Sequence, residues 1–185
     1  INTAQPITLA EAALLVPDAR TALLEFIVAE ENVYLFVLHR KAASAPVELR
    51  VLPLAIRKPQ LTELVTNFQQ ALAARQLNFT ASATALYQQL LHPAQELLKS
   101  KKSLVIVPDS VLWELPFQAL MPPSGRFLLE DYAVAYAPSL TVLRELIERK
   151  AALSKTSPTL LAFGNPTLSQ ELSGKLPALP NAEKQ

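Results

Sequence analysis

The side chains that could perform chemistry are few in this sequence. It holds two histidines, His39 and His92, and no cysteine. A serine hydrolase triad is formally available from Ser110, His92 and Asp109, because a serine hydroxyl needs a base that takes its proton and an acid that orients the base. The sequence has no GxSxG turn to hold the serine, and these residue types occur in nearly every chain. The residues alone therefore do not predict a catalytic triad.

Metal and cofactor sites are also poorly supported by the residue types. His39 and His92 lie far apart in the sequence, and neither has a pattern of further ligands nearby. The absence of cysteine excludes a disulfide, a thiolate zinc site, an iron–sulfur cluster and a cysteine nucleophile within these residues. The glycines number only 3, too few for a dinucleotide-binding or P-loop motif. We expect no cofactor and no metal.

The charge of the chain is nearly balanced, with 17 Lys+Arg against 16 Asp+Glu and a net charge of +1. Nucleic-acid binding needs a strong basic excess, so this class of protein is not predicted. Lys99, Lys101 and Lys102 follow a predicted helix, where cations complement the helix dipole, and no aromatic residues alternate with them to indicate a phosphate site. No apolar run could span a bilayer and no signal peptide is present. We expect a cytoplasmic protein that binds neither nucleic acid nor membrane.

The first half of the sequence predicts an antiparallel meander followed by helices. Residues 23–29, 33–39 and 47–52 are rich in β-branched and aromatic residues, and the third run alternates Val47, Leu49 and Val51 with charged residues. This pattern is typical of a sheet with one covered face. An apolar stripe over 61–72 predicts a helix, and a second stripe over 86–98 predicts a helix interrupted at its internal proline.

The second half predicts further strands and one more helix. Residues 103–107 are wholly apolar, which is typical of a strand covered on both faces. An extended segment over 113–118 follows, and then a strand over 132–137. Glu130 and Asp131 come directly before this strand; on a strand, adjacent carboxylates would point to opposite faces and could not share a proton, so we expect them to cap the strand that follows. Ser139 is the predicted N-cap of a helix with one buried face: Leu140, Leu143, Leu146 and Ile147. The fold class is therefore α/β, a mixed sheet with flanking helices.

The last predicted strand, over 159–163, ends in a turn formed by Gly164, Asn165 and Pro166. A loop after a buried strand lies at the carboxyl end of the sheet, where open α/β sheets bind ligands. The turn itself has no residue that could act as an acid, a base or a nucleophile. It is a candidate binding position without a catalytic residue.

A series of short segments occurs in a recognisable order. These are the helix over 86–98, SLVIVPD at 103–109, LPFQAL at 115–120, LEDYAV at 129–134, YAPSL at 136–140, LAFGNP at 161–166 and LPNAE at 179–183. In order and spacing they resemble the opening half of a CHAT domain, the caspase-like peptidase family often joined to tetratricopeptide repeats. The strands over 21–54 and the helix over 61–72 suit the segment that precedes these motifs, so the resemblance covers about 21–185.

The resemblance implies peptide hydrolysis by a Cys–His dyad. In the family the His follows a later strand in a Phe-Ala-Thr-His-Gly-like motif and the Cys comes later still, in a Ser-Ala-Cys-like motif, and neither motif occurs here. By the same resemblance, residues 1–155 form the N-terminal, non-catalytic α/β subdomain, and residues 156–185 hold the first strand and cleft loop of the caspase-like core, truncated. Gly164, Asn165 and Pro166 would border the substrate cleft, and the complete domain would bind a protein or peptide substrate.

We therefore interpret the chain as an N-terminal fragment of a CHAT-domain cysteine peptidase, inactive alone. Ile1 in place of an initiator Met and a helix-start pattern over 181–185 fit this interpretation. Two alternatives stay open. The chain could be one part of a split or processed peptidase whose C-terminal partner chain carries the dyad, or a non-catalytic interaction or scaffold module acting with a tetratricopeptide-repeat region. A serine hydrolase is the least supported.

Overall fold

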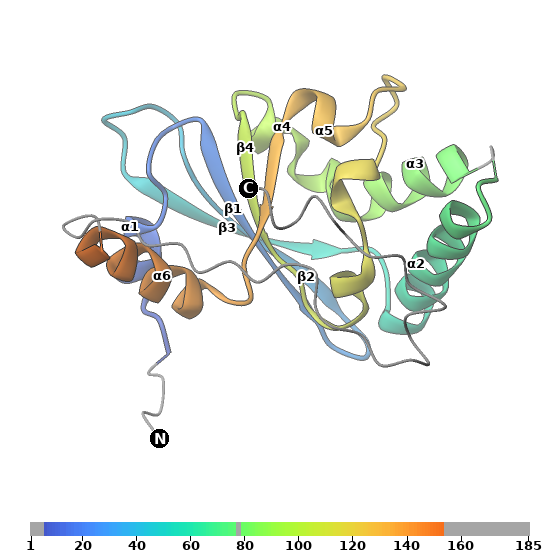
Figure 1. Ribbon diagram of the computed structural model, residues 1–185, viewed down its shortest axis with the longest axis horizontal. Helices are drawn as coiled ribbons and strands as arrows, with labels where there is room; N and C mark the ends of the chain where they lie inside the picture. The colour runs from blue at the N-terminus through green and yellow to red at the C-terminus, as the bar shows by residue number, and fades with distance from the viewer. Residues whose placement is uncertain (1–5, 77–78, 154–185) are drawn as a thin grey trace, which may run out of the picture. The chain divides into compact units, whose positions relative to one another are not determined.

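The computed structural model describes residues 6–76 and 79–153, and these form a mixed α/β sheet with flanking helices (Figure 1). The strand order is β3-β2-β1-β4-β5. The strands β1, β2 and β3 pair antiparallel, whereas β4 and β5 run parallel to β1 and to each other. The strands are β1 (Thr21–Val28), β2 (Val33–Arg40), β3 (Val47–Leu54), β4 (Ser103–Val107) and β5 (Ala133–Tyr136). The predicted fold class and the antiparallel meander are confirmed.

The helices lie mainly between the strands and after β5. The helix α1 (Leu9–Leu14) precedes the sheet, and the long helices are α2 (Lys58–Ala73), α3 (Phe79–Leu90) and α6 (Leu140–Leu153). The short helices are η1 (His92–Ala94), α4 (Gln95–Leu98), η2 (Ser110–Glu114), η3 (Phe117–Ala119) and α5 (Leu128–Asp131). The helix expected over 86–98 does break at Pro93, where it turns into η1 and restarts as α4, because proline lacks the amide that would continue the helix.

Alternation along the strands gives the sheet two different faces. On the α2–α3 face, Leu24 and Phe26 of β1 pack with Leu61 and Phe68 of α2 in the larger hydrophobic core. On the α1–α6 face, Leu23 and Leu38 pack with residues of α1 and α6 in a smaller core. Because residue i and residue i+1 of a strand point to opposite faces, β1 contributes to both cores. Both cores lie within Ile1–Arg149, one of two units into which the chain divides.

The sequence predicts that the face of β3 with Val47, Leu49 and Val51 is the covered one, but in the structure the other face of β3 is covered more fully. Leu54 is buried in the larger core and Leu52 packs against it, which places Glu48 and Arg50 on the α2–α3 face. Leu49 and Val51, on the opposite face, are 36% and 47% exposed. The reason is position: β3 is an edge strand, and of its residues on this face only Val47 packs against the smaller core within the described residues.

Two other expectations were wrong in detail. Residues 113–118 do not form one extended segment: Trp113 and Glu114 end the 3-10 helix η2, Phe117 and Gln118 lie in the 3-10 helix η3, and Leu115 between them is extended. Glu130 and Asp131 lie in the helix α5, shortly before β5, and both pair with Arg126. On α6, Leu140 is buried as expected, whereas Leu146 and Ile147 are 54% and 47% exposed. The strand expected over 159–163, the helix start at 181–185 and the domain boundary near residue 155 lie outside the described residues.

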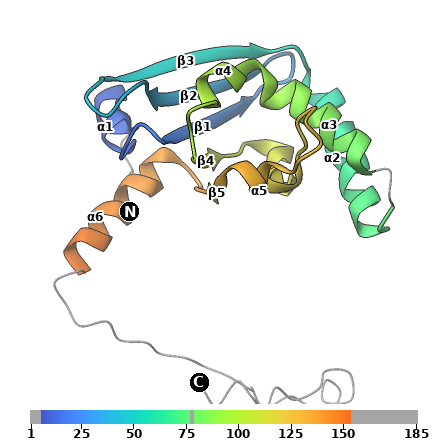
Figure 2. The ribbon, with the colours of Figure 1, turned by 90° about the horizontal axis from the view of Figure 1, so that it is seen from above.

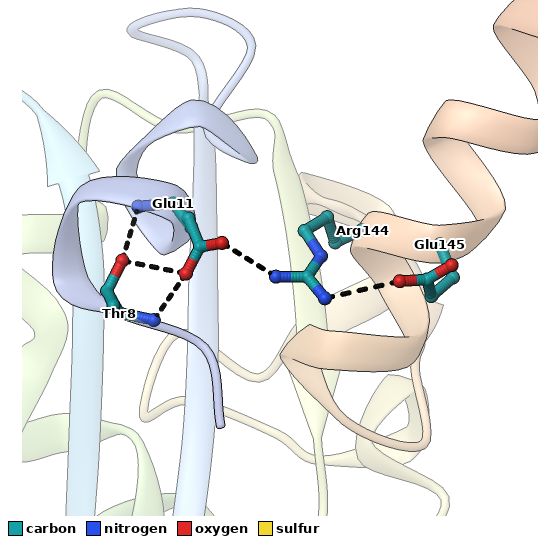
Figure 3. A network of polar contacts seen from close by, with 4 residues as sticks. All are labelled: Thr8, Glu11, Arg144 and Glu145. Atoms are coloured by element: carbon teal, nitrogen blue, oxygen red, sulfur yellow. Dashed lines mark hydrogen bonds and ion pairs between the residues drawn. The ribbon is translucent and has the colours of Figure 1, made fainter. Parts of the chain in front are cut away.

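A polar network joins α1 to α6 (Figure 3). Thr8 and Glu11 form a capping box, in which the Glu11 amide donates to Thr8 Oγ1 at 3.3 Å and the Thr8 amide donates to Glu11 Oε2 at 2.8 Å. The other carboxylate oxygen of Glu11 accepts from Arg144 Nη1 at 2.8 Å. These hydrogen bonds, from Thr8 first and Arg144 second, lower the pKa of Glu11. One side chain therefore starts α1 and holds α6.

We predict that Glu11→Ala loosens α6 without disturbing the sheet, because the substitution removes both the capping box and the ion pair to Arg144. Hydrogen exchange measured by mass spectrometry should show faster exchange of the amides over 140–149 and unchanged exchange in β1. Glu145→Ala is the matched control, since it removes the 3.2 Å contact to Arg144 Nη2 but leaves the bridge to Glu11. Unchanged exchange of α6 in Glu11→Ala would contradict the assignment.

Candidate functional site

The carboxyl ends of the parallel strands β1, β4 and β5 are the place where an open α/β sheet would hold a ligand. The turn singled out from the sequence, Gly164 to Pro166, lies outside the described residues. The described loop at this edge begins with Pro108 and Asp109 after β4, and Ala137 to Ser139 follow β5. We therefore consider the side chains that these loops place at the edge.

Asp109 has a structural role at the end of the sheet. Its Oδ2 accepts a hydrogen bond of 2.8 Å from the amide of Val28, the last residue of β1. Ser110, which follows, has a φ of 51° and is exposed. His92 lies on η1 and is also exposed, and no hydrogen bond within 6–76 and 79–153 links it to Ser110 or Asp109. The structure thus does not assemble these three residues into a triad.

The LPFQAL segment fills the α2–α3 face next to this edge. Phe117 is fully buried and its ring lies 5.3 Å from that of Phe26 on β1. The hydroxyl of Tyr136, on β5, accepts from the Phe117 amide at 2.9 Å and donates to Gln118 Oε1 at 2.7 Å. Burial raises the pKa of the Tyr136 phenol. This segment, which we call the LPFQAL plug, fills part of the larger core and is hydrogen-bonded to β5 through Tyr136. Its residues therefore have a packing role.

The second histidine, His39, is buried at the end of β2 and is 2% exposed. Its Nε2 has no hydrogen-bond partner among the described residues. Burial lowers the pKa of His39, and the charge of Lys101 lowers it further. A neutral imidazole is a potential base, but no hydrogen bond within residues 6–76 and 79–153 joins His39 to a serine or threonine hydroxyl. We interpret His39 as a core residue.

Lys101 is the feature that the sequence did not reveal. The three lysines do follow a helix, because α4 ends at Leu98. Of the three, however, only Lys99 and Lys102 are exposed. Lys101 is 2% exposed, and its Nζ donates to the carbonyl oxygens of Ala19, at 2.7 Å, and Arg40. Burial lowers the pKa of Lys101. The group is a structural clamp between segments and not a phosphate ligand.

A shallow hollow of about 180 Å³ lies on the α1–α6 face. Glu25 is its one charged lining residue, and the rest of the wall is largely apolar: Ile7, Thr8, Leu9, Ala12, Phe36, Leu38, Leu49 and Leu140. Burial raises the pKa of the Glu25 carboxyl. A single carboxylate without a second acid, a base or a nucleophile supports no reaction.

Other side chains of interest lie on the surface. Trp113 is 50% exposed on η2. Within residues 6–76 and 79–153, no three His, Asp or Glu side chains gather as metal ligands would. No helix in the same ranges is long and apolar enough to cross a membrane.

We predict that His39 makes the stability of the fold fall as the solution is acidified. An unfolded histidine gains a proton below a pH of about 6.5. The folded His39 resists protonation, so acid favours the unfolded chain and stability is lost as the pH falls below that value. Urea unfolding midpoints at a pH of about 7.5 and about 5.5 should differ less in His39→Gln than in the wild type. His92→Gln, at an exposed histidine, is the control and should keep the wild-type difference, whereas an undiminished difference in His39→Gln would refute the prediction.

Comparisons with known proteins give a family match and weak similarity to solved structures. Residues 80–185 match the CHAT domain. No curated protein matches the chain. Among solved structures, it is similar to a chain of the PilM-PilN type IV pilus biogenesis complex, with 16% identity, 69% of this chain and 40% of that chain covered, and a TM-score of 0.32. This chain therefore spans less than half of that structure, and a similarity at this level says nothing about function.

The family match covers more than half of the chain and includes every segment from α3 onward that resembled this family. It also includes the buried LPFQAL plug and the edge at β4 and β5, where the described geometry agrees with a packed α/β unit. The chain belongs to the CHAT domain family.

Proposed function

We propose that this chain is the leading, non-catalytic α/β part of a caspase-like cysteine peptidase, and that the catalytic His and Cys belong to residues outside this sequence. The observation that carries the proposal is the absence of any cysteine from a chain that belongs to the CHAT family. A caspase-like peptidase needs a thiolate as its nucleophile and a histidine to take the thiol proton. This chain has no cysteine to supply the thiolate.

The positions of the two histidines also support a catalytic dyad that lies outside this sequence. His39 is buried in the core, and His92 is exposed on η1 with no hydrogen bond to Ser110. Neither forms a pair with a nucleophile among the described residues. The catalytic base of the complete domain would therefore come from the same missing part as the nucleophile.

The folded part would act as a support for the catalytic part. The LPFQAL plug, the Asp109 contact to β1 and the Arg144 bridge fix the loops and α6 against the sheet. We further propose that Gly164, Asn165 and Pro166 border the substrate cleft of the complete domain, and that this cleft takes a protein or peptide substrate. A complementing C-terminal chain or a tetratricopeptide-repeat region would be its protein partner.

We predict that the 185-residue chain alone hydrolyses no peptide, because acyl transfer to a thiol cannot occur without one. A panel of fluorogenic peptides with basic, acidic and apolar residues before the scissile bond should give rates equal to the buffer blank. A fluorophosphonate probe should likewise not label Ser110 or any other serine. Peptide cleavage or labelling by the purified chain would overturn the proposal.

The positive arm of this experiment uses the protein extended through the residues that encode a His motif and a Cys motif. The extended protein should cleave at least one peptide of the panel and should lose this activity after treatment with iodoacetamide. The alternative of a non-catalytic interaction module predicts no cleavage by the extended protein either. Activity that appears only after mixing with a separate chain would identify a split peptidase.

A further inference from the structure

The strand β3 leaves one side of the sheet open. Within residues 6–76 and 79–153 it is the terminal strand in the order β3-β2-β1-β4-β5 and pairs only with β2. Figure 2 shows it along the outer margin of the sheet. Within the described residues, no backbone hydrogen bond joins β3 to any segment other than β2. An eight-residue edge strand of this kind is a template for pairing with another strand.

The position of Pro53 fixes which backbone groups face outward. Residues of an antiparallel strand alternate between bonding one neighbour and pointing away from it. Pro53 has no amide hydrogen, so its position opposite Tyr34 is one that points away from β2. By alternation, Val47, Leu49 and Val51 also direct their amide and carbonyl groups outward. These three residues can therefore form a new ladder without breaking a bond to β2.

The charges on β3 match a second copy of the same strand. In an antiparallel pair centred on Leu49, each Leu49 lies opposite its counterpart, and Val47 lies opposite Val51 of the other copy. Glu48 then lies opposite Arg50 of the other copy, twice, because the two-fold axis repeats the contact. Opposite charges directly across a strand pair are stabilising. In the same register, the residues that form backbone hydrogen bonds between the copies are Val47, Leu49 and Val51, whose backbone groups point away from β2. The backbone and the charged side chains therefore favour the same register.

The exposed apolar side chains fit this pairing too. Leu49 and Val51 are 36% and 47% exposed on the α1–α6 face, next to Leu38 and Phe36 of β2. Pairing would bring Leu49, Val47 and Val51 of both copies together and cover part of this apolar surface. A net charge of +1 imposes little repulsion between copies. We propose that the chain forms a two-fold homodimer through β3, in which the two sheets become one continuous sheet.

The experiment measures self-association of the full 185-residue chain by sedimentation velocity. Strand-edge interfaces are small, so the wild type should pass from monomer to dimer between about 1 and about 100 µM. Arg50→Glu places two acidic residues opposite each other at both ends of the axis, and Glu48→Arg does the same with two basic residues. Each variant should weaken the dimer by about tenfold or more.

Mixing the two variants provides the decisive arm. Glu48 and the introduced glutamate of one chain then lie opposite Arg50 and the introduced arginine of the other, so a heterodimer should form although each variant alone is weakened. Arg57→Glu is the matched control: Arg57 is exposed, lies outside β3 and pairs with Glu31 at 3.3 Å, so this variant should dimerise like the wild type.

Backbone pairing is tested by Leu49→Pro, which removes an outward amide and leaves the bonds to β2 in place, and which should abolish the dimer. Circular dichroism of each variant verifies that the chain is folded. A wild type that stays monomeric at about 100 µM would overturn the proposal. So would a folded Arg50→Glu variant that dimerises as the wild type does, or a mixture of the two charge variants that forms no heterodimer.

Discussion

The ammonium group of Lys101 is the interaction on which the join between the two halves of the sheet depends. It is 2% exposed and bonds the carbonyl oxygen before β1, at Ala19, and the one at the end of β2, at Arg40. The amides of Lys102 and Ser103 then bond the carbonyl of Arg20, which aligns β4 alongside β1. A buried cation is costly unless its hydrogen bonds are made. The antiparallel meander and the parallel strands therefore meet at a point where the chain has little freedom to rearrange.

The motifs that define the family are, in the described residues, mainly packing devices. Phe117 of LPFQAL packs on Phe26, and Tyr136 of YAPSL bonds the Phe117 amide and Gln118. The Asp109 carboxylate at the end of SLVIVPD bonds the last amide of β1. The segments that resemble the CHAT family thus hold a sheet and its loops together and supply no reactive group in the described residues. Packing residues of this kind make a rigid scaffold, on which loops can carry function.

The sequence predicts the sheet better than it predicts the details of the site. Strands β1 to β5 follow from apolar runs and alternation, and the break at Pro93 follows from the missing amide. Residues 113–118 also alternate, but the structure divides them between the 3-10 helices η2 and η3, where Phe117 packs on the distant Phe26 of β1 and Leu115 is buried in the same core. The helix α1 could have been found from the Thr8–Glu11 capping box. Lys101 could not, because its two acceptors lie 82 and 61 residues away in the sequence.

The bridge between Glu11 and Arg144 has a mechanical consequence. It links the first helix of the N-terminal unit to the last, so the two segments by which this unit connects to anything beyond it are fastened to each other. Tension applied along the chain would load the ion pair and the contacts of α1 with α6 before it reached the strands. A surface ion pair contributes little stability, whereas paired strands are held by a row of hydrogen bonds. The unit would respond to a pull by releasing α6 first, with the five strands still paired.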